Sequence, residues 1–205
     1  RLYRPPPQGS RAVFGEPREA SRVTTGIPGF SAPTVGTEAP LEMLSACHGR
    51  IEAQCATLRR LVPHLLVHGV DEEARTAATR VMHYFDTAAM HHHADEEDEL
   101  FPALIESMAG SDAICLREMI DGLKADHRAL EACWRHLRGI LERIAAGEQE
   151  SSLVADDVEA LAVRYARHIE YEEKELLPMA ARLLSDEDLA RVGRAMRERR
   201  GIDEV

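Results

Sequence analysis

The chain has 205 residues, a hydrophobic fraction of 44%, an aromatic fraction of only 4% and a formal net charge of -11. A chain of this length can bury a core, and its Ala- and Leu-dominated apolar residues favour an all-α fold over a sheet. The negative charge disfavours nucleic acid and anionic membranes as partners, and no apolar run is long enough to span a bilayer. Metal cations and other proteins are the partners that this composition favours.

Residues 1–37 differ in composition from the rest of the chain. They contain six of the ten prolines and five of the thirteen glycines, show no helical periodicity, and carry five Arg against two Glu. We expect an irregular arm that becomes ordered only by docking, either on its own domain or on a second copy in a homodimer. The chain is therefore divided into a Pro/Gly-rich N-terminal arm, 1–37, and one helical domain, 38–205.

From Leu41 onward, apolar residues recur three and four positions apart, which is the period of amphipathic helices. Turn and capping residues divide this region into four long helices and a short C-terminal helix that begins with a capping-box pattern. The expected ranges are 41–67, 72–108, 112–146, 153–184 and 186–200. Four long helices joined by short connections predict an all-α, up-down-up-down four-helix bundle.

The cysteines point to a reducing compartment. None of the four shows CxxC spacing, and all lie in helical segments: Cys47, Cys55, Cys115 and Cys133. This pattern suits reduced thiols better than a disulfide framework or a zinc knuckle. We therefore expect a cytoplasmic protein.

Histidines and acidic residues share a repeated spacing. Seven of the ten histidines have Asp or Glu four residues later, far more than the acidic share of 36 in 205 would give. Positions i and i+4 lie on one face of a helix, so such a pair can point toward a single ion. The prediction rests on one pair in each long helix: His48/Glu52, His92/Glu96, His127/Glu131 and His168/Glu172.

The helix lengths place these four histidines at one level of the bundle. In antiparallel neighbours, two residues share a height when they are equally far from the connecting turn. His48 lies 19 residues before position 67, and His92 lies 20 residues after position 72. The same comparison for the second and third helices, and for the third and fourth, agrees to within about one helical turn. Each histidine also lies on an apolar stripe of its helix. Independent surface ion pairs have no reason to share a level, so we expect the imidazoles and at least two carboxylates to meet inside the bundle.

Carboxylates buried in an apolar interior need a compensating charge, and a bound metal supplies it. Imidazole together with carboxylate suits Fe, Mn or Zn rather than Ca or Mg. For a ring of ligands from four helices, two metals bridged by carboxylate explain the set better than one. Four side chains beside the ligands turn about 100° or more from the core line and are expected to face solvent, with ion entry or support of the ligands as the alternative role: His91, His93, Glu97 and Asp98.

The segments HHHADEEDELFP and HIEYEEKELLP repeat one pattern. When His92 is aligned with His168, six of eleven positions match, and the chain becomes two helix pairs, each with a lone His followed by HxxxE. This double pattern, over about residues 40–184, resembles the hemerythrin-like HHE cation-binding family. The resemblance implies a non-haem di-iron centre, that is, two iron ions with an oxo or hydroxo bridge, with Mn or Zn as alternatives.

Transferred to this chain, the family pattern assigns His48 and His92 to one metal and His127 and His168 to the other. It gives Glu96 and Glu172 the bridging or capping role.

The chain departs from the oxygen-carrying members of the family on the third helix. Those members have a second His where this chain has Glu131, and Glu52 takes the equivalent place in the first half. A carboxylate in place of an imidazole ligand favours the higher oxidation state of the metal. We therefore expect redox sensing rather than reversible oxygen carriage. We therefore expect a binding or sensing protein for oxygen, peroxide, nitric oxide or iron, with no catalytic residue assigned.

Two alternatives remain open at this point. A carboxylate-rich ligand set also suits a di-iron oxidase or peroxidase-type enzyme. A helical interaction module would instead use its acidic run as solvated surface and dock a partner through its basic C-terminal helix.

Overall fold

The structure is a computed structural model that describes residues 39–108, 112–149 and 153–202. The expected N-terminal arm and its proposed dimer contact lie outside the described residues. Within them the chain forms helices and no strand, which confirms the all-α prediction. The elements are α1 (Pro40–His68), α2 (Glu72–Asp86), α3 (Ala88–Asp95), η1 (Glu96–Leu100), α4 (Phe101–Ser107), α5 (Asp112–Ala146), α6 (Ala155–Tyr171), η2 (Glu172–Leu176), α7 (Leu177–Leu183) and α8 (Asp186–Arg199).

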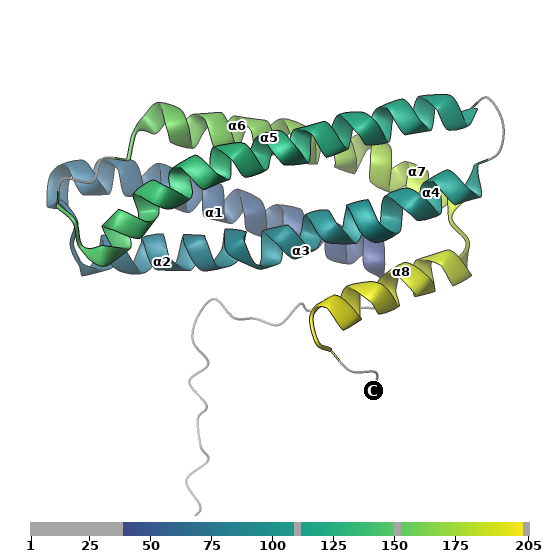
Figure 1. Cartoon of the computed structure of the whole chain (residues 1–205), viewed down its shortest axis with the longest axis horizontal. Helices are drawn as coiled ribbons and strands as arrows, with labels where there is room; N and C mark the ends of the chain where they lie inside the picture. Colours follow the sequence, from purple (N-terminus) through teal and green to yellow (C-terminus); the bar gives the residue numbers. More distant parts are fainter. Residues whose placement is uncertain (1–38, 109–111, 150–152, 203–205) are drawn as a thin grey trace, which may run out of the picture. The chain divides into compact units, whose positions relative to one another are not determined.

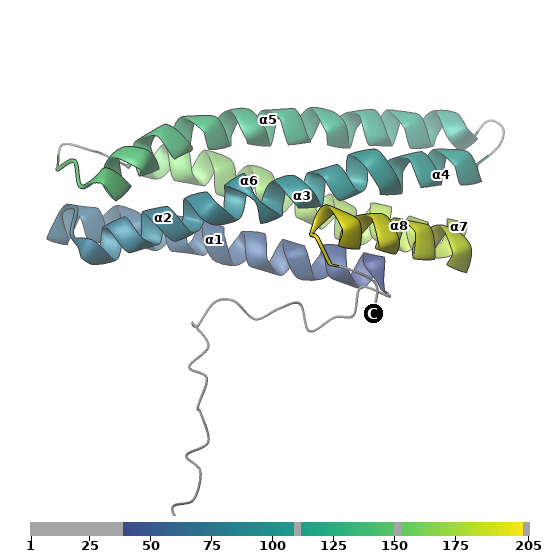
Figure 2. The ribbon, with the colours of Figure 1, turned by 60° about the horizontal axis from the view of Figure 1, so that its bottom comes forward.

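Four rods form the bundle: α1, the run α2–α4, α5, and the run α6–α7. α1 packs against α2 and α6, and α5 packs against the same two helices, so the rods surround a common interior. Figure 1 shows each rod running back along the one before it. α8 packs on the outside, against α1, α3 and η1, as Figure 2 shows. Among the described residues, no helix combines the length and apolar character needed to cross a membrane.

Local sequence signals set several helix ends. The Asp71 side chain accepts a hydrogen bond from the Ala74 backbone N–H and begins α2. Ser185 and Asp188 form a capping box at the start of α8, as their spacing predicts. Gly147 ends α5 with a φ of 88°, a left-handed conformation that glycine adopts without strain.

Two rods contain a wider, π-helical turn within the helices expected over 72–108 and 153–184. In η1 the Phe101 backbone N–H bonds to the carbonyl of Glu96, five residues back, and in η2 Leu177 bonds to Glu172 in the same way. The residue after each of these N–H donors is a proline, Pro102 or Pro178. Proline lacks an N–H, and its ring pushes away the carbonyl group four residues back. A π-helical turn accommodates this and changes which side chains face inward.

The core consists of two apolar clusters with the histidine level between them. One cluster is built around Phe85, Trp134 and Tyr165, and the other around Leu44, Phe101 and Leu123. On each rod, the candidate histidine stands where the chain passes from one cluster to the other. The polar side chains therefore form a single layer inside the bundle.

Candidate metal centre

The structure brings together the four histidines that the sequence places at one level. All four are at most 4% exposed: His48, His92, His127 and His168. The rings of His48 and His92 meet edge to face with centroids 4.9 Å apart. On the other side, Nε2 of His127 lies 3.1 Å from Nε2 of His168. The imidazoles thus form two pairs, one from the first and second rods and one from the third and fourth.

Two fully buried carboxylates, Glu96 and Glu172, link the two pairs. Glu172 has Oε2 3.1 Å from Nε2 of His48 and Oε1 3.0 Å from Nε2 of His168. Glu96 has Oε1 3.5 Å from Nε2 of His92 and Oε2 3.3 Å from Nε2 of His127. Each carboxylate therefore presents one oxygen to each half of the cluster.

Two groups of metal donors follow from this arrangement, and they share both carboxylates. In each group, one donor atom per residue lies within 4.8 Å of all the others. One group consists of His48, His92, Glu96 and Glu172, and the other of His127, His168, Glu96 and Glu172. We name them the first and the second half-site.

The donor atoms lack other partners among the described residues. Both carboxylate oxygens of Glu96 and of Glu172 are buried without a hydrogen bond of acceptable geometry, as are Nε2 of His48 and of His92. Leaving so many polar atoms buried and unpaired is costly. A pair of cations between the carboxylates would remove this cost, so the residues present fit a dinuclear centre.

Without metal, the cluster must balance its charge with protons. Burial, together with the neighbouring Glu172, raises the pKa of Glu96 to about 8. Burial acts on Glu172 too, but the close imidazoles of His127, His168 and His48 outweigh it and hold its pKa well below the usual range. Burial opposes protonation of His127, yet Glu172, Glu96 and Glu97 together raise its pKa to about 10. Metal ions entering the cluster must displace these protons.

The residue after each shared carboxylate orients a histidine of the opposite half. Nδ1 of His48 donates to Oε1 of Glu173 at 2.6 Å, and Nδ1 of His127 donates to Oε1 of Glu97 at 2.7 Å. The Glu97 side chain is 32% exposed and also reaches the cluster, so the expectation that it only faces solvent is wrong. Glu97 lies about 100° from Glu96 around the rod, on the flank that faces α5, so both carboxylates reach the interior.

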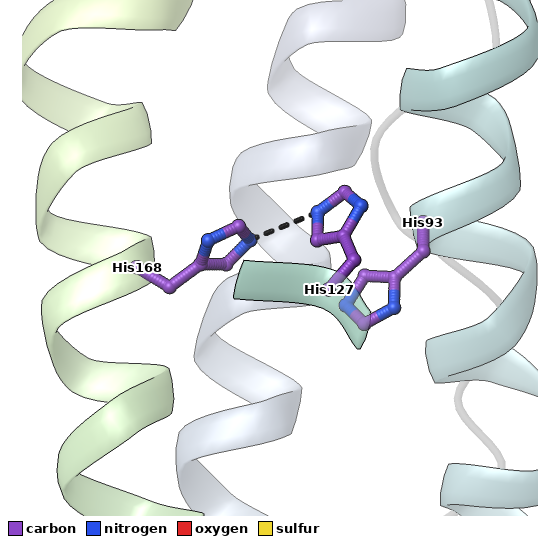
Figure 3. Close-up of side chains that lie close together, drawn as sticks. All are labelled: His93, His127 and His168. Carbon is purple, nitrogen blue, oxygen red and sulfur yellow. Dashed lines mark hydrogen bonds between the residues drawn. The ribbon is translucent and has the colours of Figure 1, made fainter. Parts of the chain in front are cut away.

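His93 was also expected to face solvent, and this expectation is wrong as well. Its Nε2 is buried, and its ring stacks on that of His127 with centroids 4.0 Å apart and an interplanar angle of 12°. Figure 3 shows His93, His127 and His168 converging from three rods. A rod in a four-rod bundle faces two neighbours, so residues about 100° apart can both reach the interior.

Glu52 and Glu131 do not join the cluster, which corrects the prediction that they ligate the metals. Glu52 is exposed, and the Glu131 side chain is 61% exposed and lies 3.8 Å from Arg135. On these two rods, the buried residue that follows the histidine is three positions on, Ile51 or Leu130. The position four residues on therefore falls on the outer flank.

The C-terminal helix α8 fixes the turn that carries the ligands of the second rod. Asp95, between His92 and Glu96 in the chain, is fully buried and is held by Arg199 and by Nη2 of Arg200 at 2.6 Å. Arg199 also bonds Asp98 and Glu99. These two arginines of the basic C-terminal segment thus contact the chain's own domain, which weakens the expectation that this segment docks a partner.

An all-α bundle with a buried imidazole–carboxylate cluster suited to metal ions defines the class of this protein. The family model for the hemerythrin HHE cation binding domain matches residues 39–180. An uncharacterized protein of Haemophilus influenzae is 32% identical over 165 residues, which cover 80% of this chain and 92% of that protein. The chain belongs to the hemerythrin HHE cation-binding domain family.

Proposed function

We propose that this protein holds two iron ions in the buried cluster and uses them to bind or sense a small molecule. The observation that carries the proposal is the orientation of Glu96 and Glu172, each of which presents one oxygen to either half-site. A carboxylate placed in this way can bridge two metals, whereas a single metal would leave one oxygen of each buried and unpaired.

The residues divide the work between them. His48 and His92 would hold one iron, and His127 and His168 the other, each through Nε2. Glu173 and Glu97 would keep the imidazoles of His48 and His127 in the tautomer that presents Nε2 to the metal, because a carboxylate can only accept the Nδ1–H.

An iron pair in this site would supply a reversible change of redox state and coordination positions open to a small ligand. The apolar clusters above and below the layer keep bulk water away from the ligands. This favours binding or sensing of oxygen, peroxide, nitric oxide or iron itself. The four cysteines are free thiols, and we propose the cytoplasm as the compartment.

The di-iron oxidase or peroxidase reading has lost part of its support. It drew on a carboxylate-rich ligand set that included Glu52 and Glu131, and both are exposed. The remaining set has four imidazoles and two carboxylates.

Metal analysis with an optical spectrum tests the proposal. The protein, purified without chelators and loaded with iron, should hold two iron ions per chain and show an oxo-to-ferric charge-transfer band after oxidation. Less than one transition metal per chain would overturn the proposal. Stopped-flow mixing of the ferrous protein with peroxide then separates the two readings, because a sensor gives one stoichiometric oxidation and an enzyme gives many turnovers.

A further inference from the structure

The short helix α8 lies on the outside of the bundle, across elements that carry metal donors. It packs against α1, α3 and η1, as Figure 2 shows. These elements contribute three of the six donor residues of the cluster, His48, His92 and Glu96. α8 therefore covers the outer side of the rods that hold these donors.

The apolar attachment of α8 is small. Of its 14 residues only three are buried, Val192, Gly193 and Met196. α8 touches the bundle along one face, whereas α1 and α5 each pack against two neighbouring rods. An element with few buried contacts opens at a lower free energy than the core of a domain. α8 can therefore detach while the four rods stay folded.

The charged attachment joins α8 to the chain beside the donors. Asp95 is fully buried and is held by Arg199 and by Nη2 of Arg200 at 2.6 Å. Arg199 also bonds two carboxylates of η1. Because Asp95 directly precedes Glu96 in the chain, release of α8 would take the countercharge away from the turn that carries this donor and loosen it.

Metal ions need an opening of this kind to reach the donors. The four histidines of the cluster are at most 4% exposed, and Glu96 and Glu172 are fully buried. A hydrated cation cannot pass through a close-packed interior. With α8 released, the carboxylates that its arginines now neutralise would attract an incoming cation to the edge of the cluster.

We propose that α8 is a strap that controls the exchange of metal between the cluster and solvent. While α8 is docked, the rods stay closed over the donors, and metal enters or leaves only during its release. This inference rests on the proposed two-iron centre and adds a moving part to it. Loosening such a strap speeds uptake and release by the same factor and leaves the affinity unchanged. Loosening a ligand instead speeds release alone and weakens binding.

The test uses the full chain and cobalt(II), whose visible d–d absorption reports binding, and then its release to excess chelator. Met196→Ala removes apolar contacts of α8 and leaves every donor and both arginines in place. We expect uptake and release to become about tenfold faster, with an unchanged dissociation constant. Hydrogen exchange of the α8 backbone amides should become faster in parallel. Arg191→Gln, which breaks exposed ion pairs of α8 with Glu106 and Asp188, should change none of these.

A second control separates release of α8 from a general loss of stability. Leu141→Ala truncates a fully buried side chain of α5 in the apolar cluster around Phe85, on the other side of the histidine layer. If it speeds metal exchange as much as Met196→Ala does, general destabilisation explains the effect and the inference is wrong.

The double change Arg199→Gln and Arg200→Gln loosens α8 from its charged end and should speed exchange as well. If neither this variant nor Met196→Ala exposes the α8 amides, these contacts do not hold a strap and the inference is wrong. If the amides become exposed and the rates stay the same, or release alone becomes faster, the inference is also wrong and the two-iron proposal stands. If the unaltered protein takes up neither cobalt nor iron, both are wrong.

Discussion

His48 on α1 donates from Nδ1 to Oε1 of Glu173, on η2, at 2.6 Å. The second half of the chain repeats this bond between His127 on α5 and Glu97 on η1, at 2.7 Å. Both acceptors directly follow a shared carboxylate. Each π-helical turn therefore supplies a carboxylate that lies between the two half-sites. Its next residue is a glutamate that orients an imidazole on a neighbouring rod.

Removing this support should weaken metal binding without removing a ligand. We expect Glu173→Ala to lower iron affinity about 10–100-fold, because the imidazole of His48 loses its fixed tautomer and some basicity. Competition with a chromophoric chelator measures the change. Glu175→Ala, a substitution of an exposed glutamate in the same turn, serves as the control. Equal affinities for the two variants would show that the hydrogen bond does not tune the site.

The shared carboxylates and the two exposed glutamates should behave in opposite ways. Glu172→Ala removes a donor from both half-sites, so we expect metal content to fall from two iron ions to one or fewer per chain. Glu131→Ala changes a side chain that is 61% exposed and should retain both. Elemental analysis of iron against protein concentration decides between them. A loss of iron in Glu131→Ala would restore the ligand role that the sequence suggested.

The sequence predicts much of this fold because its signals are local. The helix expected over 112–146 matches α5, and the caps at Asp71 and Ser185 form as predicted. The common level of the four histidines also follows from counting residues to the turns, because a helix has a constant rise.

The sequence does not predict the parts that depend on rotation about a helix axis. A π-helical turn rotates every later residue, and Pro102 and Pro178 were the available signal for it. The direction of Glu97 depends instead on how its rod is turned toward α5, which the sequence does not give. The difference between Glu52 and Glu96, both four residues after a histidine, likewise depends on how each rod is turned toward its neighbours.

The metal-free protein should be most stable near pH 6.5. The pKa of His127 is raised to about 10 and that of Glu96 to about 8, so the folded state keeps protons that the unfolded chain has lost at higher pH. Stability from His127 falls as pH rises from 6.5 to about 10, and stability from Glu96 falls as pH rises from 4.5 to about 8. Burial lowers the pKa of His92 to about 3 and that of His93 well below 6.5. Below pH 6.5 the unfolded chain therefore binds more protons, and stability falls again.

Thermal unfolding followed by circular dichroism between pH 4 and pH 10 measures this maximum. Iron-loaded protein is the control, because bound metal displaces the protons and should remove the decline above pH 6.5. A melting temperature of the metal-free protein that rises steadily to pH 9 would contradict the assignment of the protons.

The contact of α8 with Asp95 should contribute strongly to stability. The double change Arg199→Gln and Arg200→Gln leaves a fully buried carboxylate without its partners. We expect the free energy of unfolding to fall by about 3–5 kcal/mol, as for other buried ion pairs that lose one side. Urea-induced unfolding measures it. Arg59→Gln, which breaks an exposed pair with Glu159, should change the free energy of unfolding far less, because solvent screens that pair. Similar losses in both variants would show that α8 does not anchor the turn.

The central claim is that Glu96 and Glu172 lie between two metal ions inside the bundle. Crystals of the iron-loaded protein, measured on both sides of the iron absorption edge, test it most directly. The account predicts two anomalous peaks in the layer between the apolar clusters, each beside two imidazoles and both in contact with the two carboxylates. A single peak, or peaks outside this layer, would contradict it.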